Sequence, residues 1–172
     1  MSPKERCSRA ERRGISSAEQ MIEVGDRVPY FRAFAASLGR EVSSRSCAGC
    51  RLVLVFHSEN TAYLLKEINR AVRDRYPSTE DVVVAGVVDL SLVPPLYWLT
   101  ASLIVGQIHG RSVPANDALT LQDWGGLISR RFGVQEVGRN ITVIVANEHA
   151  RISGLYRGLE PVGPVLRALE ED

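Results

Sequence analysis

The chain has 172 residues, a length that suits one domain of about 150 residues with a short tail. Hydrophobic residues account for 45% of it and charged residues for 24%, as in ordinary soluble globular proteins. The formal net charge of +1 gives no argument for nucleic acid or a membrane surface as the main partner. We therefore expect a flexible basic arm over residues 1–20 and a single domain over residues 21–172.

The start of the chain does not look like a secretory signal, because its basic residues are not followed by an apolar run of about 7–15 residues. The most apolar stretch, residues 96–108, is shorter than the roughly 20 residues that cross a bilayer. Three cysteines do not make the disulfide framework of a small secreted domain. These features predict a cytoplasmic protein without membrane insertion.

The first half of the chain predicts a strand–helix–strand unit. Residues 24–31 indicate a loop that enters a short extended segment, and the polar, Ser/Arg-rich residues 39–49 indicate a turn or hairpin. Residues 52–56 form a continuous apolar run, typical of a strand buried on both faces. Residues 61–76 show helical spacing and residues 81–88 form a second apolar run, which together predict a right-handed parallel βαβ unit.

The second half of the chain predicts further helices and an antiparallel strand pair. The expected elements are a helix over residues 94–110, a loop over 111–120, a helix over 123–132, strands over 141–146 and 151–156, and a helix over 161–169. This order implies an α/β sandwich with a mixed sheet whose last two strands are antiparallel.

Four stretches carry motifs in a recognisable order: residues 24–31 (VGDRVPYF), 53–56 (VLVF), 121–134 (LQDWGGLISRRFGV) and 141–152 (ITVIVANEHARI). They resemble the entry motif, the central strand, the Asp-containing helix and the last hairpin of the redoxin branch of the thioredoxin fold, the alkyl hydroperoxide reductase and peroxiredoxin-like superfamily. The resemblance covers roughly residues 22–170. It implies a thioredoxin-like three-layer α/β sandwich, with a central mixed sheet and helices on both faces.

The resemblance also implies where reactive groups should stand. Peroxiredoxins place Thr-x-x-Cys after the central strand, and here Thr61 keeps the threonine while Leu64 takes the position of the peroxidatic cysteine. In the thioredoxin register the two cysteines would fall on Thr61 and Leu64, neither of which can be a thiolate nucleophile. No proline stands near Ile141, where thioredoxins have a cis-proline, and Arg139 is the candidate counterpart of the peroxiredoxin arginine.

A CxxC motif, Cys47-Ala48-Gly49-Cys50, does occur, but it precedes the strand at residues 52–56. Next to a βαβ pattern this spacing normally indicates a thioredoxin-type site, whose first thiol follows a strand at a helix N-terminus. Two interpretations stay open. The pair is either redox-active, with Arg45 and Arg51 favouring thiolate, or a structural disulfide or two incidental thiols.

The CxxC spacing also suits two ligands of a tetrahedral zinc site. A complete site would need two more ligands from a short set, namely Cys7, His57, His109 and His149. Nothing in the sequence places two of them near the cysteines. We therefore expect neither a metal site nor a cofactor.

A second candidate site is formed by His57, Ser58, Glu59 and Thr61, directly after the strand at residues 52–56. Open α/β sheets bind ligands at the carboxyl ends of their strands, so these side chains could line a polar pocket or imitate a nucleophile–base pair. The alternative is a helix start, in which a hydroxyl caps the helix and Glu59 complements the helix dipole.

The third candidate is the predicted helix over residues 94–108, which contains Tyr97 and Trp98 and is apolar almost all round. Such a helix should be covered by something. Packing within the domain, a homodimer interface and a groove for an acyl-type ligand are the alternatives.

Three functions compete on this basis. The first is a binding module that holds an unknown protein or an apolar small molecule, either in the former active-site cleft or on the 94–108 helix, with a homodimer as one form. The second is an atypical thiol-disulfide oxidoreductase that uses Cys47 and Cys50. The third is non-redox catalysis at His57, Ser58 and Glu59.

Overall fold

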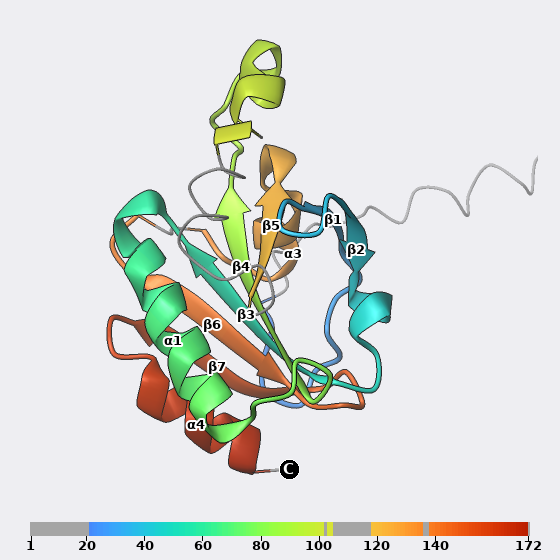
Figure 1. Cartoon of the computed structure of the whole chain (residues 1–172), viewed down its shortest axis with the longest axis vertical. Coiled ribbons are helices and arrows are strands. Elements are labelled where there is room, and N and C mark those ends of the chain that lie inside the picture. The colour runs from blue at the N-terminus through green and yellow to red at the C-terminus, as the bar shows by residue number, and fades with distance from the viewer. Residues whose placement is uncertain (1–20, 102, 105–117, 136–137, 172) are drawn as a thin grey trace, which may run out of the picture.

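The computed structural model describes residues 21–101, 103–104, 118–135 and 138–171 (Figure 1). The expected basic arm (residues 1–20), the end of the expected 94–110 helix, Cys7 and His109 all lie outside these residues. The described strands form one seven-stranded sheet with the order β2-β1-β5-β4-β3-β6-β7. No helix in the described ranges is long and apolar enough to cross a membrane.

The sheet is mixed, as predicted. Its strands are β1 (Arg32–Ala35), β2 (Arg40–Ser43), β3 (Arg51–His57), β4 (Val82–Asp89), β5 (Leu119–Asp123), β6 (Ile141–Ala146) and β7 (Ile152–Gly158). β3 is parallel to β4, and β4 is parallel to β5. The pairs β1–β2, β1–β5, β3–β6 and β6–β7 are antiparallel. The predicted βαβ unit and final hairpin are therefore confirmed.

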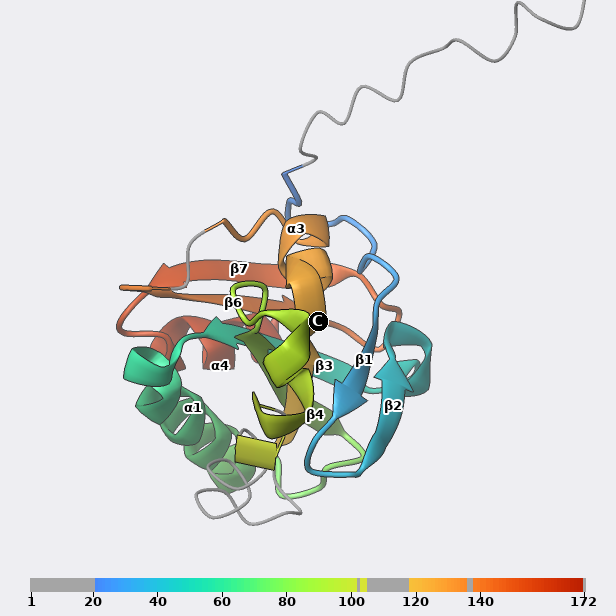
Figure 2. The ribbon, with the colours of Figure 1, turned by 90° about the horizontal axis from the view of Figure 1, so that it is seen from above.

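Helices cover both faces of this sheet. They are α1 (Ala62–Arg75), α3 (Leu127–Arg131) and α4 (Val162–Glu170), and short 3-10 turns lie at Ser44–Cys47, Glu59–Thr61, Pro95–Tyr97 and Trp124–Gly126. α1 and α4 lie together on one face, and α3 lies on the other (Figure 2). The result is the expected three-layer α/β sandwich.

The side chains of the central strand β3 divide between two hydrophobic cores, one on each face of the sheet. Its side chains alternate between the faces, so Leu54 and Phe56 join the cluster beneath α3, while Val53 and Val55 join the cluster beneath α1 and α4. All of these side chains are almost completely buried. A continuous apolar run is what a strand covered on both faces requires.

Two details of the prediction are wrong. Residues 119–123 form β5, where a loop up to residue 120 and a helix from residue 123 were expected, and α3 starts at Leu127. The polar residues Thr120 and Gln122 made this strand look like a loop in the sequence. Both are buried, and β5 lies between β4 and β1 in the sheet. The predicted 94–110 helix starts as a 3-10 turn at Pro95 and is helical in its described part up to residue 104.

Candidate functional site

His57 ends β3 on the face covered by α1, and its side chain is only 1% exposed. Its Nδ1–H donates to the backbone oxygen of Ser58 over 3.1 Å. The ring lies against Gly86 on β4, where a Cβ would stand 2.8 Å from His57 Nε2 and 2.5 Å from Leu65 Cδ2. The imidazole is therefore packed into the core beneath α1, and the glycine makes room for it.

The residues after His57 form a capping turn. The backbone N–H of Ser58 donates to Thr61 Oγ1 over 3.0 Å, and the two hydroxyl oxygens are 3.2 Å apart. Thr61 is 4% exposed, and the 3-10 turn Glu59–Thr61 leads directly into α1. Glu59 is exposed. These contacts match the helix-start interpretation, because the hydroxyls satisfy each other and the first turn.

Arg139 reaches the same end of the sheet as His57. It lies in a bend just before β6, and β6 runs antiparallel to β3 with Thr142 opposite Phe56. The residue is exposed. None of the peptide bonds in the described part of the chain is cis, including the one before Ile141. The structure thus brings His57, Ser58, Glu59, Thr61 and Arg139 to one end of the molecule, with His57 and Thr61 buried and Glu59 and Arg139 facing solvent.

One polar residue at this end was not singled out from the sequence. Asp123 ends β5, is 1% exposed, and accepts hydrogen bonds from Ile128 N–H (2.9 Å), Ser129 N–H (2.8 Å) and the Ser129 hydroxyl (2.8 Å). Its carboxylate therefore anchors the start of α3 to the sheet. The signal in the sequence was an aspartate followed by the Gly125-Gly126 turn, in which both glycines have positive φ.

Cys47 and Cys50 lie at the opposite end of β3, in and after the 3-10 turn Ser44–Cys47. Both thiols are free and half-buried. The Cys50 N–H donates to the Cys47 carbonyl over 3.2 Å, and the Gly49 N–H donates to the Glu148 carbonyl over 3.3 Å. The motif is thus tied to the turn between β6 and β7, far from the end of β3 that carries His57.

Burial raises the pKa of the Cys47 thiol, and the neighbouring Cys50 acts in the same direction. Cys47 packs against the core cluster on the α3 side of the sheet, which explains the desolvation. A reactive thiol needs the reverse, a lowered pKa in an electropositive and accessible setting. The environment of Cys47 therefore disfavours thiolate.

The two flanking arginines do not compensate for this burial. Arg45 stacks over the ring of Tyr30 at 5.2 Å, and Arg51 stacks over the ring of Tyr76 at 4.4 Å. Arg51 also donates to the carbonyl of Leu169 over 3.0 Å. The prediction that these arginines favour thiolate is not supported, because both guanidinium groups are used to hold elements together.

The hollow beside Gly49 is acidic. It is lined by Gly49, Arg51, Glu80, Asp81 and Glu148. Within the described ranges, no group of three or more His, Cys, Asp or Glu side chains could hold a metal ion. His149 follows Glu148 in the β6–β7 turn and is exposed, whereas His57 is buried at the far end of β3.

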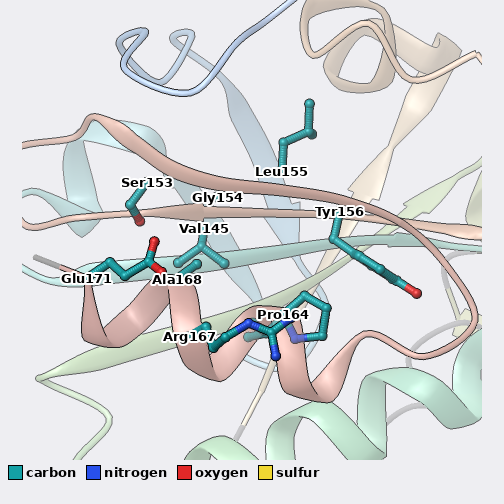
Figure 3. Close-up of a pocket in the computed structure, with 10 residues that line it drawn as sticks. Val145, Ser153, Gly154, Leu155, Tyr156, Pro164, Arg167, Ala168 and Glu171 are labelled. Atoms are coloured by element: carbon teal, nitrogen blue, oxygen red, sulfur yellow. The ribbon is translucent and has the colours of Figure 1, made fainter.

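A small hollow between β7 and α4 is shown in Figure 3. Its lining includes Val145, Tyr156, Val165, Arg167 and Ala168. Its volume of about 180 Å³ is below the roughly 300–1,000 Å³ of pockets that hold drug-sized ligands. This hollow therefore adds no binding site for such a ligand.

Residues 92–104, which we call the apolar arm, project beyond the carboxyl end of β4 (Figure 1). Trp98 contacts the domain through the ring of Trp124, whose centroid lies 5.2 Å away, and its indole N–H donates to the Val93 carbonyl within the arm over 2.8 Å. The other large side chains of the arm are far more exposed, from 50% to 95%: Leu92, Leu96, Tyr97, Leu99, Leu103 and Ile104. Packing within the described domain therefore covers one side of the arm only.

No protein-family model matches the chain, and no curated protein matches it. Solved structures do. A protein from Chlorobium tepidum, provisionally assigned as the thiol:disulfide interchange protein DsbE, superposes with a TM-score of 0.63 at 17% identity, over 86% of this chain and 99% of that one. The chain has a thioredoxin-like fold. This agrees with the resemblance to the redoxin branch seen in the sequence.

Two further structures with this fold are similar to the chain. The thiol peroxidase from Chromobacterium violaceum gives a TM-score of 0.60 at 16% identity, over 88% of each chain. The exposed lipoprotein thioredoxin Etrx1 from Streptococcus pneumoniae gives 0.60 at 14% identity, over 84% of this chain and 100% of that one. At these identities the likeness shows the thioredoxin-like fold and carries no activity over to this chain.

Proposed function

We propose that the protein is a binding module on a thioredoxin-like fold, without the peroxidatic or CxxC site that would follow the central strand. The observation that carries this is the stretch from the end of β3 to the start of α1. It holds a buried His57 and a closed Ser58–Thr61 capping turn, and no cysteine. Without a thiol at that position, the thiolate chemistry of the fold has no nucleophile there.

The remaining thiols support the same conclusion. Cys47 and Cys50 lie at the other end of β3, the pKa of Cys47 is raised, and the adjacent hollow is acidic. The expected partner is a protein or an apolar small molecule bound through the exposed apolar arm, with no role for nucleic acid, membrane insertion or a cofactor. We place the protein in the cytoplasm.

The test is an insulin-reduction assay with dithiothreitol and a peroxide-consumption assay with the same reductant. The expected rate with the wild-type protein equals the rate without protein, and Cys47→Ser does not change it. A thioredoxin serves as the positive control. A wild-type rate clearly above the background that disappears in Cys47→Ser would overturn the proposal.

The second candidate is an atypical thiol-disulfide oxidoreductase at Cys47 and Cys50. The observation in its favour is that both thiols are free and only half-buried, in a turn that Gly49 closes with a φ of +88°. Loss of an activity on Cys47→Ser would support this candidate. Catalysis at His57, Ser58 and Glu59 has less support, because the ring is buried and the Ser58 hydroxyl pairs with Thr61. Support for this catalytic candidate would be an activity that His57→Gln removes and Cys47→Ser leaves intact.

A further inference from the structure

The exposed side chains of the apolar arm form one stripe. Leu96, Leu99 and Leu103 are spaced three and four residues apart, so they share one face of the helical turns, with Tyr97 and Ile104 beside them. Trp98 points the other way, onto Trp124. The arm is therefore fixed to the domain by one side, and its leucine side has no cover within the described residues.

We infer that a second copy of this chain covers the stripe, in a two-fold symmetric dimer of arm against arm. The inference rests on the proposed function, because it names the partner of that binding surface. In a two-fold symmetric dimer the same surface of each subunit forms the contact. The stripe must therefore be able to pack against an identical stripe without repulsion. Here no Asp, Glu, Lys or Arg occurs from residue 90 to residue 110, so no like charges would meet.

The composition of the stripe favours a permanent partner. Transient interfaces are about as polar as the rest of a protein surface, whereas homodimer interfaces are more apolar and resemble a core cut in half. The five large apolar side chains of the stripe are at least 50% exposed. At roughly 100 Å² each they present on the order of 500 Å², more than half of the ~800 Å² that each partner buries in a standard interface.

A lipid surface fits the arm less well than a second copy. Helices that lie in a membrane interface combine an apolar face with a polar face rich in Lys and Arg, which attracts anionic lipids. The arm has no basic residue, and its opposite face is the tryptophan contact with the domain. We therefore treat vesicle binding as a competing outcome of the test.

The experiment is sedimentation velocity of the full chain from about 1 to about 100 µM. The expected mass is twice 18.9 kDa for the wild type. Leu99→Asp and Leu103→Asp should each weaken dimerisation at least ~30-fold, as expected on removing a buried anchor of an interface. The matched control is Leu159→Asp, an exposed leucine (49%) in the turn after β7, which should leave the dimer intact.

Cysteine cross-linking locates the interface independently. In a background with Cys7, Cys47 and Cys50 changed to Ser, at least one of Leu96→Cys, Leu99→Cys and Leu103→Cys should form an intermolecular disulfide on oxidation, and Leu159→Cys should not. Circular dichroism should show the same folded state in every variant, since the replaced side chains are exposed.

Several results would overturn the dimer. They are a wild-type mass of one chain at every concentration, equal dissociation by Leu159→Asp, or a monomer that co-floats with phosphatidylcholine vesicles through the arm. None of these readouts involves thiol chemistry. A failed dimer therefore leaves the absence of oxidoreductase activity standing, and detected activity would leave the dimer standing.

Discussion

The His57 ring occupies the space that any side chain at Gly86 would need, because a Cβ at residue 86 would lie 2.8 Å from His57 Nε2. The two residues stand on adjacent parallel strands, β3 and β4. This contact links a residue that looked like a catalytic candidate in the sequence to a glycine in an otherwise apolar strand. It explains both residues as parts of one packing arrangement.

Gly86→Ala should therefore destabilise the fold by about 1–3 kcal/mol, the usual cost of overpacking a close-packed core. The new methyl group would collide with His57 and Leu65 at the same time. Urea unfolding monitored by circular dichroism measures the change. The matched control is Gly163→Ala in α4, where the nearest atom is Arg167 Nη1 at 3.5 Å, and which should be neutral or stabilise by up to about 1 kcal/mol. Equal stability of Gly86→Ala and the wild type would contradict the packing described for His57.

Asp123→Ala should cost at least about 2 kcal/mol, because it leaves the buried N–H groups of Ile128 and Ser129 without their acceptor. Asp89→Ala is the control. Asp89 ends the neighbouring strand and accepts a hydrogen bond from the exposed Ser91 N–H over 2.8 Å, so its loss should cost about 1 kcal/mol or less. Urea unfolding of both variants decides the point, and a smaller effect at Asp123 than at Asp89 would be incompatible with the anchoring role.

Cys47 should react slowly with iodoacetamide at pH 8, because its pKa is raised above the ordinary cysteine value of 9.0 and the thiolate is the reacting form. The sign for stability follows from the same shift. A raised folded-state pKa contributes stability that is fully present below the unfolded pKa and is lost as the pH rises through the folded one. Relative to Cys47→Ser, the wild type should therefore lose stability above about pH 9. The same chain in urea provides the alkylation control, and faster reaction in the folded state would refute the shift.

The Cys47–Cys50 pair, if oxidised, should have a reduction potential below about −270 mV, the value of thioredoxin. Strongly oxidising pairs owe their potential to a stabilised thiolate, and burial beside an acidic hollow removes that stabilisation. Thiol quantitation across a dithiothreitol series measures the potential. A value between about −120 and −270 mV would instead place the pair among catalytic dithiols and favour the oxidoreductase candidate.

The contact between Trp98 and Trp124 provides a direct optical measurement of the arm, because these are the two tryptophans of the chain. Their rings are 5.2 Å apart and inclined by 38°. Trp98→Phe should abolish the coupled tryptophan signal in circular dichroism and leave global unfolding nearly unchanged. Tyr63→Phe, on the exposed face of α1, is the control. An unchanged signal in Trp98→Phe would show that the arm is not docked on Trp124.

The sequence was sufficient to predict those elements that a single hydrophobic pattern defines. The apolar runs of β3 and β4 around α1 predicted the parallel unit, the turn at residues 147–150 between two strands predicted the last hairpin, and helical spacing predicted α4. β5 could not be found in this way. It places Thr120 and Gln122 in the interior, and buried polar residues in a short strand look like a loop when the sheet around them is unknown.

The candidate site depended on contacts between distant parts of the chain, which no local pattern reveals. Arg51 looked like a neighbour that activates a thiol, but Tyr76 and the end of α4 hold its guanidinium group. His57 looked accessible at a strand end, but Gly86 and Leu65 enclose it. We expected the helix over residues 94–108 to be covered, and the structure shows that, among its described large side chains, Trp98 packs against the ring of Trp124.

The length of β3 has a consequence for any chemistry of this protein. Cys50 precedes the strand and His57 ends it, and seven residues of extended chain measure roughly 20 Å. A substrate shorter than this distance cannot contact the thiol pair and the imidazole at the same time. The thiol pair and the imidazole would therefore have to act on separate small substrates, at opposite ends of the central strand β3.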